Sequence, residues 1–237
     1  MALSSPQQAE LQDQWRGVIM LYLQVKPYVI ASEKAVACLS DELEGVGKER
    51  LSVTAINELR NAFDHAVRAQ AVLHGWIPVP TKAGLPDYDY CHINLDKAKG
   101  HVYRAGYDAL DIVTTARAEE IRKIRDGLRP STLVTVFPQY ADEIRQPLDQ
   151  ALQLCDEAKS SKDVESDNMG QQYYAMYKDA LGLLDSVLSK LTDSLPELAA
   201  VDTEKRQEYK RQRNIAIILA IVGIVVTILA SCWFAPR

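Results

Sequence analysis

The residues best suited to chemistry lie on two stretches, and each contains a histidine followed three positions later by an arginine. The first stretch holds Arg60, Asn61, Asp64, His65 and Arg68. An imidazole exchanges protons near neutral pH, and a guanidinium matches a phosphate with two parallel hydrogen bonds. This combination suits acid–base chemistry on a phosphate ester.

The second stretch repeats the pattern. Lys97, His101, Arg104 and Asp108 recur every three or four residues, so they share one face of a helix. If the two helices are antiparallel neighbours, we expect a polar network that includes Asp64, Arg68, His101, Arg104 and Asp108. The alternative is structural, because such pairs also form ordinary ion pairs worth about 0.3–0.5 kcal/mol on an exposed helix face.

Arg60-Asn61, followed by His65, resembles the Arg-x4-His motif of HEPN domains, in which a polar residue, often asparagine, follows the arginine. HEPN domains are dimerising α-helical bundles, and many are metal-independent ribonucleases found in toxin–antitoxin and anti-phage systems. The resemblance covers residues 30–128. It implies that His65 is the general acid or base at a ribose 2′-hydroxyl, that Arg60 steadies the phosphate, and that Asn61 orients its neighbours.

Apolar residues recur at helical spacing through most of the chain, and alternation with a period of two is nearly absent. This pattern predicts an all-α bundle of long antiparallel helices. The expected helices cover residues 5–43, with a kink or an interruption at Pro27, then 52–73, 94–127, 139–159 and 169–195, and a last helix starts near 202. We expect residues 74–92 to form a long connection. Residues 132–137 are expected to be a short extended connector, with a single strand as the alternative.

Residues 215–234 form the longest apolar run of the chain and contain no charge. A helix of this length spans about 30 Å, the thickness of a bilayer core. Lysines and arginines gather just before the run, which predicts that the preceding residues face the cytoplasm. The run therefore predicts a C-terminal transmembrane anchor and a tail-anchored, single-pass membrane protein, in the inner membrane if the source is bacterial.

Small residues recur every four positions within that run, at Gly223, Thr227 and Ser231. Small side chains at this spacing allow two membrane helices to approach closely, so they predict pairing between anchors. The expected division of the chain is a HEPN-like bundle at 1–128, a helical extension at 129–201, a basic juxtamembrane helix at 202–214 and the anchor at 215–234.

Charge and cysteine content limit the function classes. The net charge is −5, and because residues 205–237 are basic, residues 1–204 carry −10. An acidic body argues against broad, charge-driven nucleic-acid binding. The four cysteines lie far apart without a CxxC pair, and no phosphate-binding or metalloprotease motif occurs. We expect no metal and no cofactor.

Three functions agree with these features. The first is a tail-anchored interaction and oligomerisation module, as a component of a bacterial anti-phage or stress system. The second is a membrane-tethered HEPN-like ribonuclease that uses Arg60 and His65. The third is an oligomerising, membrane-disrupting effector. The expected partners are the lipid bilayer, a second copy of the chain, another protein, and RNA as a candidate substrate.

Overall fold

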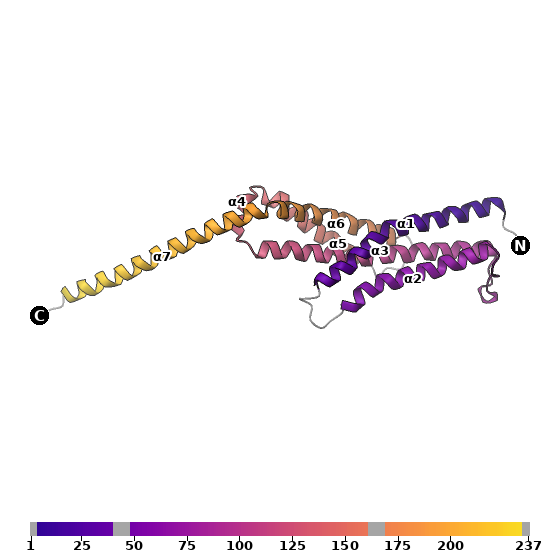
Figure 1. Cartoon of the computed structure of the whole chain (residues 1–237), viewed down its shortest axis with the longest axis horizontal. Coiled ribbons are helices and arrows are strands. Elements are labelled where there is room, and N and C mark those ends of the chain that lie inside the picture. Colours follow the sequence, from indigo (N-terminus) through magenta and orange to yellow (C-terminus); the bar gives the residue numbers. More distant parts are fainter. Residues whose placement is uncertain (1–3, 40–47, 161–168, 234–237) are drawn as a thin grey trace.

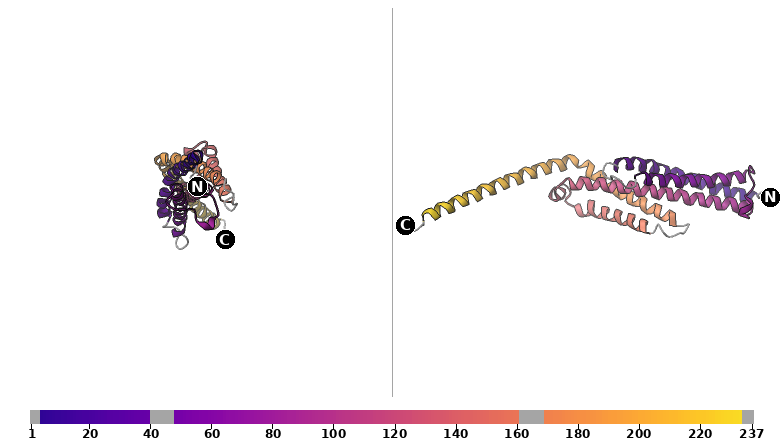
Figure 2. Two further views of the ribbon diagram at one scale, coloured as in Figure 1. Left: turned by 90° about the vertical axis from the view of Figure 1, so that its right-hand side faces the viewer. Right: turned by 90° about the horizontal axis from the view of Figure 1, so that it is seen from below.

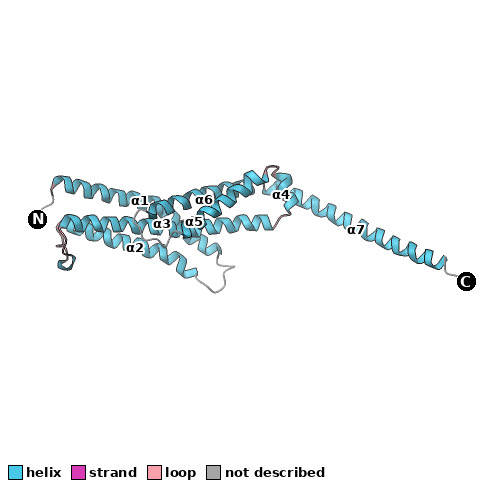
Figure 3. Ribbon diagram, turned by 180° about the vertical axis from the view of Figure 1, so that it is seen from behind, coloured by secondary structure: helices cyan, strands magenta, loops and turns pink. Residues whose placement is uncertain are grey.

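The described part of the protein consists of helices, turns and short connections, without a strand. The computed structural model describes residues 4–39, 48–160 and 169–233, of which residues 37–39, 48–52, 169 and 225–233 are described by their backbone alone. The elements are α1 (Ser5–Leu39), α2 (Lys48–Leu73), the 3-10 turn η1 (Thr81–Ala83), α3 (Asp87–Asp126), α4 (Pro130–Val136), the π-helical turn η2 (Ala141–Arg145), α5 (Gln146–Ser160), α6 (Met169–Asp193) and α7 (Leu195–Trp233). The predicted all-α fold is confirmed (Figure 3).

The central element is α3, which packs against α1, α2 and α6. In Figure 1 these helices lie side by side along the length of the molecule, and the end-on view in Figure 2 shows them gathered into a bundle. Helix α5 packs mainly against α6 and only slightly against α3. Because α3 is 40 residues long, it reaches from one end of the bundle to the other.

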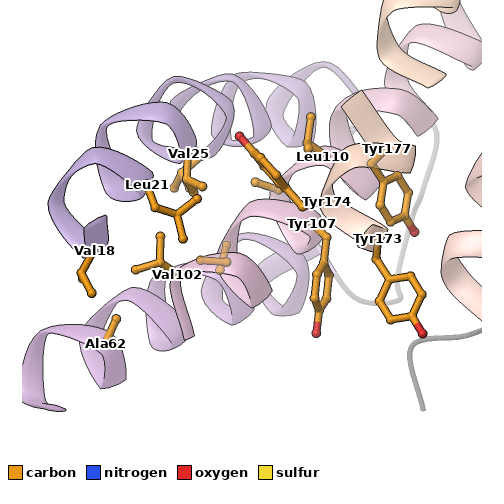
Figure 4. Close-up of a cluster of buried hydrophobic side chains, with 14 of the residues drawn as sticks. Val18, Leu21, Val25, Ala62, Val102, Tyr107, Leu110, Tyr173, Tyr174 and Tyr177 are labelled. Atoms are coloured by element: carbon orange, nitrogen blue, oxygen red, sulfur yellow. The ribbon is translucent and has the colours of Figure 1, made fainter. Parts of the chain in front are cut away.

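A first buried cluster joins α1, α2, α3 and the start of α6. Figure 4 shows Leu21 and Val25 of α1 above Val102 of α3, with Tyr174 of α6 on the other side of Val25. Tyr177, also on α6, is fully buried, and its hydroxyl donates a hydrogen bond to Asp111 Oδ1 at 3.0 Å. The buried residues recur at helical spacing, so one stripe of each helix supplies this core.

A second cluster fills the other half of the molecule, where the end of α3 meets α4, α5, α6 and the start of α7. Ile121, Ile144, Leu184 and Leu198 are all fully buried in it. A third, smaller cluster lies where α1 and α2 meet the start of α3, and it includes Leu11. Both α3 and α6 contribute to the first two clusters, so these helices connect the two halves.

The main differences between the helix boundaries and the sequence expectations lie at prolines. Helix α7 begins at Leu195, just before Pro196, and not near residue 202. Helix α1 continues through Pro27, so the expected interruption there is wrong. Helix α3 begins at Asp87, directly after Pro86, which shortens the expected connection to residues 74–86. The stretch expected to be an extended connector forms the short helix α4, with Pro130 in its first turn. Proline is accepted at this position because the first amide of a helix has no intrahelical partner.

The base of α7 is fixed to α4 by polar contacts. Asp202 Oδ1 accepts a hydrogen bond from Thr132 Oγ1 at 3.2 Å, and its other carboxylate oxygen pairs with Arg206. Lys205 Nζ donates to the Ser131 carbonyl at 2.7 Å. Two basic residues of the expected juxtamembrane segment are therefore engaged in contacts within the protein.

Beyond these contacts, α7 leaves the bundle as a single long helix (Figures 1 and 2). Its described apolar part, residues 215–224, has exposed side chains such as Ile218 and Leu219. The remainder of the expected run, with Thr227 and Ser231, lies outside the residues whose side chains are described.

Within the residues that the structure describes, no helix has an apolar stretch of sufficient length to cross a membrane. This finding contradicts the predicted transmembrane anchor. The expectations of a tail-anchored protein and of a single-pass membrane location are corrected with it. Of the expected pairing stripe, only Gly223 falls among the described side chains.

Candidate functional site

The polar residues expected on two helices do meet, at the contact between α2 and α3. His65 Nδ1 lies 2.8 Å from Asn94 Oδ1, and His101 Nδ1 lies 2.7 Å from Glu58 Oε2. Glu58 and His65 are seven residues apart in α2, as are Asn94 and His101 in α3. Seven residues are close to two helical turns, so the antiparallel helices are joined by two polar contacts at matching positions.

The two histidine rings lie between these contacts and stack on each other. Their centroids are 5.3 Å apart and their planes differ by 15°. Side chains of an α-helix lean toward its N-terminus. Because α2 and α3 run in opposite directions, His65 leans toward the level of Glu58, and His101 leans toward the level of Asn94. The antiparallel pairing therefore brings the rings together.

The hydrogen bonds of Asn94 determine the tautomer of His65. Asn94 Nδ2 donates to the Tyr90 carbonyl at 2.8 Å, so its Oδ1 is the atom that faces the imidazole. A carbonyl oxygen only accepts hydrogen bonds, so His65 Nδ1 carries the proton. In the neutral ring the Nε2 atom is then the free base.

The same reasoning applies to His101. A carboxylate only accepts hydrogen bonds, so His101 Nδ1 carries a proton and donates it to Glu58. Arg104 Nε donates to the same carboxylate oxygen at 2.9 Å. A second Arg104 nitrogen lies 2.8 Å from His101 Nδ1, but both atoms are then donors, so we interpret this approach as a contact without a hydrogen bond.

Most side chains of this cluster are less exposed than those of the ion pairs on the protein surface. The side chains of His101 and Glu58 are 17% and 20% exposed, whereas that of Arg104 is 41% exposed. Asn94 is buried. The cluster therefore combines two imidazoles of fixed orientation with one partly exposed cation. Two imidazoles can act as a general base and a general acid, and a guanidinium can stabilise negative charge on a phosphate.

The other predicted site residues lie elsewhere. Arg60 is exposed and lines a groove between α1 and α2. Five residues separate it from His65, which places it about 140° around the helix. Asn61 is half-buried, and Asp64 and Arg68 form an exposed ion pair of 2.7 Å.

Asp108, the last member of the expected network, affects the pKa values of nearby tyrosines. Burial raises the pKa of Tyr107 to about 12, and the negative charge of Asp108 adds to this effect. Burial also raises the pKa of Tyr177, where Asp111 contributes most after burial and Asp108 less. Of the expected network, the structure brings His101 and Arg104 together with His65.

Glu58 and Asn94 were missed in the sequence, although a signal for them exists. Each stands seven residues before a histidine of the pair. In a helix this spacing places the polar residue and the histidine on the same face, two turns apart.

Another cleft lies away from the histidines, between α3 and α5. It has a volume of about 730 Å³ and is lined by side chains of both charges, including Asp111 and Arg122, together with the Cys155 thiol. Burial raises the pKa of Cys155, so its thiol is a weak nucleophile at neutral pH. Among the described residues, no three histidine, cysteine, aspartate or glutamate side chains are grouped to hold a metal ion.

We compared the chain with known protein families, curated proteins and solved structures. No protein-family model, curated protein or solved structure matches this chain.

Proposed function

We propose that the protein cleaves RNA by metal-independent acid–base catalysis, as the resemblance to HEPN domains implies, with His65 and His101 as the proton-transferring residues. The observation that carries the proposal is the stacked pair, in which each Nδ1 is held by a partner while no contact of either Nε2 is seen among the described residues. This assignment keeps His65 from the sequence motif and replaces Arg60 with groups on α3.

The reaction requires two proton transfers. One histidine, neutral, accepts the proton of the ribose 2′-hydroxyl at Nε2, and the 2′-oxygen attacks phosphorus. The other histidine, protonated, donates its Nε2 proton to the departing 5′-oxygen as the P–O5′ bond breaks. The products are a 2′,3′-cyclic phosphate and a free 5′-hydroxyl.

The partners of the two rings suggest which has which role. His101 lies 2.7 Å from the carboxylate of Glu58, so we assign it as the acid. His65 faces the neutral amide of Asn94, so we assign it as the base. Arg104 would place its charge near the phosphate, where negative charge grows in the transition state.

The test uses the full-length protein and a single-stranded RNA with a fluorophore at one end. We expect wild type to cleave this RNA, to leave a matched 2′-deoxy oligonucleotide intact, and to produce 2′,3′-cyclic phosphate ends. His65→Gln and His101→Gln should each lower the rate by about 100-fold or more, the usual contribution of general acid–base catalysis.

The matched control is His92→Gln. His92 also lies on α3, pairs with Asp96 at 3.2 Å and has a partly exposed side chain, but it is not part of the stacked pair. Its replacement should leave the rate unchanged. Failure of wild type to cleave any RNA, together with lower melting temperatures for both histidine variants, would show that the pair only fixes the register of α2 against α3.

A further inference from the structure

The α1–α2 groove, defined as the hollow between residues 15–22 of α1 and 56–66 of α2, has a volume of about 450 Å³. Its floor is made of buried side chains such as Val18, Ala62 and Val102. Its walls are apolar side chains that face solvent. The groove is thus an open apolar channel between two helices.

Exposed apolar side chains of both helices border this channel. Phe63 is 70% exposed, and Ile56, Ile19 and Tyr22 are between 38% and 46% exposed. Single exposed apolar residues are common on protein surfaces, but a group of them around a hollow marks a binding surface. A helix between two helices buries such a group by packing its ridges into the groove.

Arg60 is the charged residue of the groove, and it sets the chemistry of the occupant. Within the described part of the chain, it has neither an ion-pair partner nor a hydrogen-bond acceptor. An occupant that covered Arg60 without offering a negative charge would leave a buried, unpaired cation, which is strongly unfavourable. The occupant should therefore place a carboxylate opposite Arg60.

We propose that the α1–α2 groove binds an amphipathic helix of a partner protein, with an apolar stripe for the walls and an aspartate or glutamate beside that stripe for Arg60. Residues 56–66 of α2 rise about 15 Å, which matches about three turns of a bound helix. Three turns present apolar side chains at i, i+3 or i+4, and i+7. Phe63 is the central contact.

This inference does not depend on the proposed nuclease. Arg60 and Phe63 face the groove, whereas His65 faces α3 and contacts Asn94. Loss of RNA cleavage in a histidine variant and loss of helix binding in a groove variant are therefore separate outcomes.

The test is selection from a phage-displayed library of 16-residue helical peptides, randomised on one face, with the full-length protein as target. We expect enriched sequences to share the apolar stripe and an acidic residue at its edge. For Arg60→Glu as target, the same edge position should become lysine or arginine. This reversal is specific, because a nonspecific apolar surface would not exchange one sign of charge for the other.

Individual enriched peptides are then measured by fluorescence anisotropy. Phe63→Ala should weaken binding by about 10-fold or more, the size of effect seen for a buried aromatic anchor. Since Phe63 is largely exposed, this variant should fold normally, which circular dichroism checks. The matched control is Val134→Ala, which shortens a side chain that is 55% exposed on α4, and it should bind like wild type.

Two results would overturn the proposal. The first is enrichment that is the same for wild type, Phe63→Ala and Arg60→Glu. The second is a wild-type protein that sediments as a dimer and becomes a monomer in Phe63→Ala, while no peptide binds. In that case the occupant is a second copy of this chain.

Discussion

Gly106 on α3 marks the closest approach of three helices, so its replacement by alanine tests the packing directly. A Cβ atom at this position would lie 2.8 and 2.9 Å from two ring carbons of Tyr174 and 2.9 Å from a methyl group of Val25. Carbon atoms are normally about 3.5–4.0 Å apart at contact. Both neighbours are buried, and the Tyr174 ring also packs against Tyr28 and Tyr103, so it has little room to move away.

Two opposing effects give the magnitude. Overpacking a filled core by one methyl group costs about 1–3 kcal/mol. Alanine in place of glycine inside a helix stabilises the helix by about 1 kcal/mol. We therefore expect Gly106→Ala to lower the free energy of unfolding by about 0–2 kcal/mol, the net of these ranges.

The control is Gly182→Ala on α6, where a Cβ would meet nothing within 4 Å. This change stabilises the helix without overpacking the core, so it should raise the free energy of unfolding by about 0.5–1 kcal/mol. Urea unfolding followed by circular dichroism should therefore separate the two variants by about 1–3 kcal/mol, with Gly106→Ala the weaker. If Gly106→Ala proves as stable as Gly182→Ala, the close packing of α1, α3 and α6 is refuted.

Three further predictions concern single side chains. Burial, aided by the charge of Asp87, raises the pKa of Cys91 to about 11. Iodoacetamide should therefore alkylate Cys91 at least about 100-fold more slowly in the native protein than in urea. Peptide mapping by mass spectrometry measures this difference in rate. Tyr177→Phe removes the hydrogen bond to Asp111 and should cost about 1–3 kcal/mol in a urea titration; an unchanged midpoint would contradict the contact. The hydrogen bond from Arg206 holds the pKa of Asp202 below its ordinary value of 3.8, so the stability difference between wild type and Asp202→Asn should stay constant above about pH 5 and shrink as the pH falls below about 4.

Helical periodicity predicted the fold class and most helices, because each helix buries a single stripe. The errors in helix boundaries occurred at prolines. Pro27 costs a helix about 3 kcal/mol in isolation, but Val25 and Val29 on either side of it are buried in the first cluster, and this packing keeps α1 continuous. Pro130 lies in the first turn of α4, a position that sequence alone did not distinguish from a break.

The boundary expected at residue 128 stays a prediction. The start of α6, which lies after that boundary, contributes Tyr173, Tyr174 and Tyr177 to the cluster shared with α1 and α3. Such long-range packing depends on how the chain returns along the bundle, and local periodicity carries no information on it.

The candidate site was predicted in part. The repeated His-x-x-Arg spacing identified His65, His101 and Arg104 and the meeting of their helices. The motif placed Arg60 beside His65 by analogy, whereas helical geometry separates them around α2. Glu58 and Asn94 could not be assigned because the register between two helices, which pairs each of them with a histidine, is a property of the packed structure.

The contacts at the base of α7 determine the direction of the whole helix. Because Asp202 and Lys205 hold the first turns of α7 against α4, the orientation of the projecting part follows that of α4. The helical segment from Lys210 to Trp233 is about 36 Å long, so a tilt of about 10° at its base moves its far end by about 6 Å. Any small rearrangement of α4 is thereby amplified at a distant point.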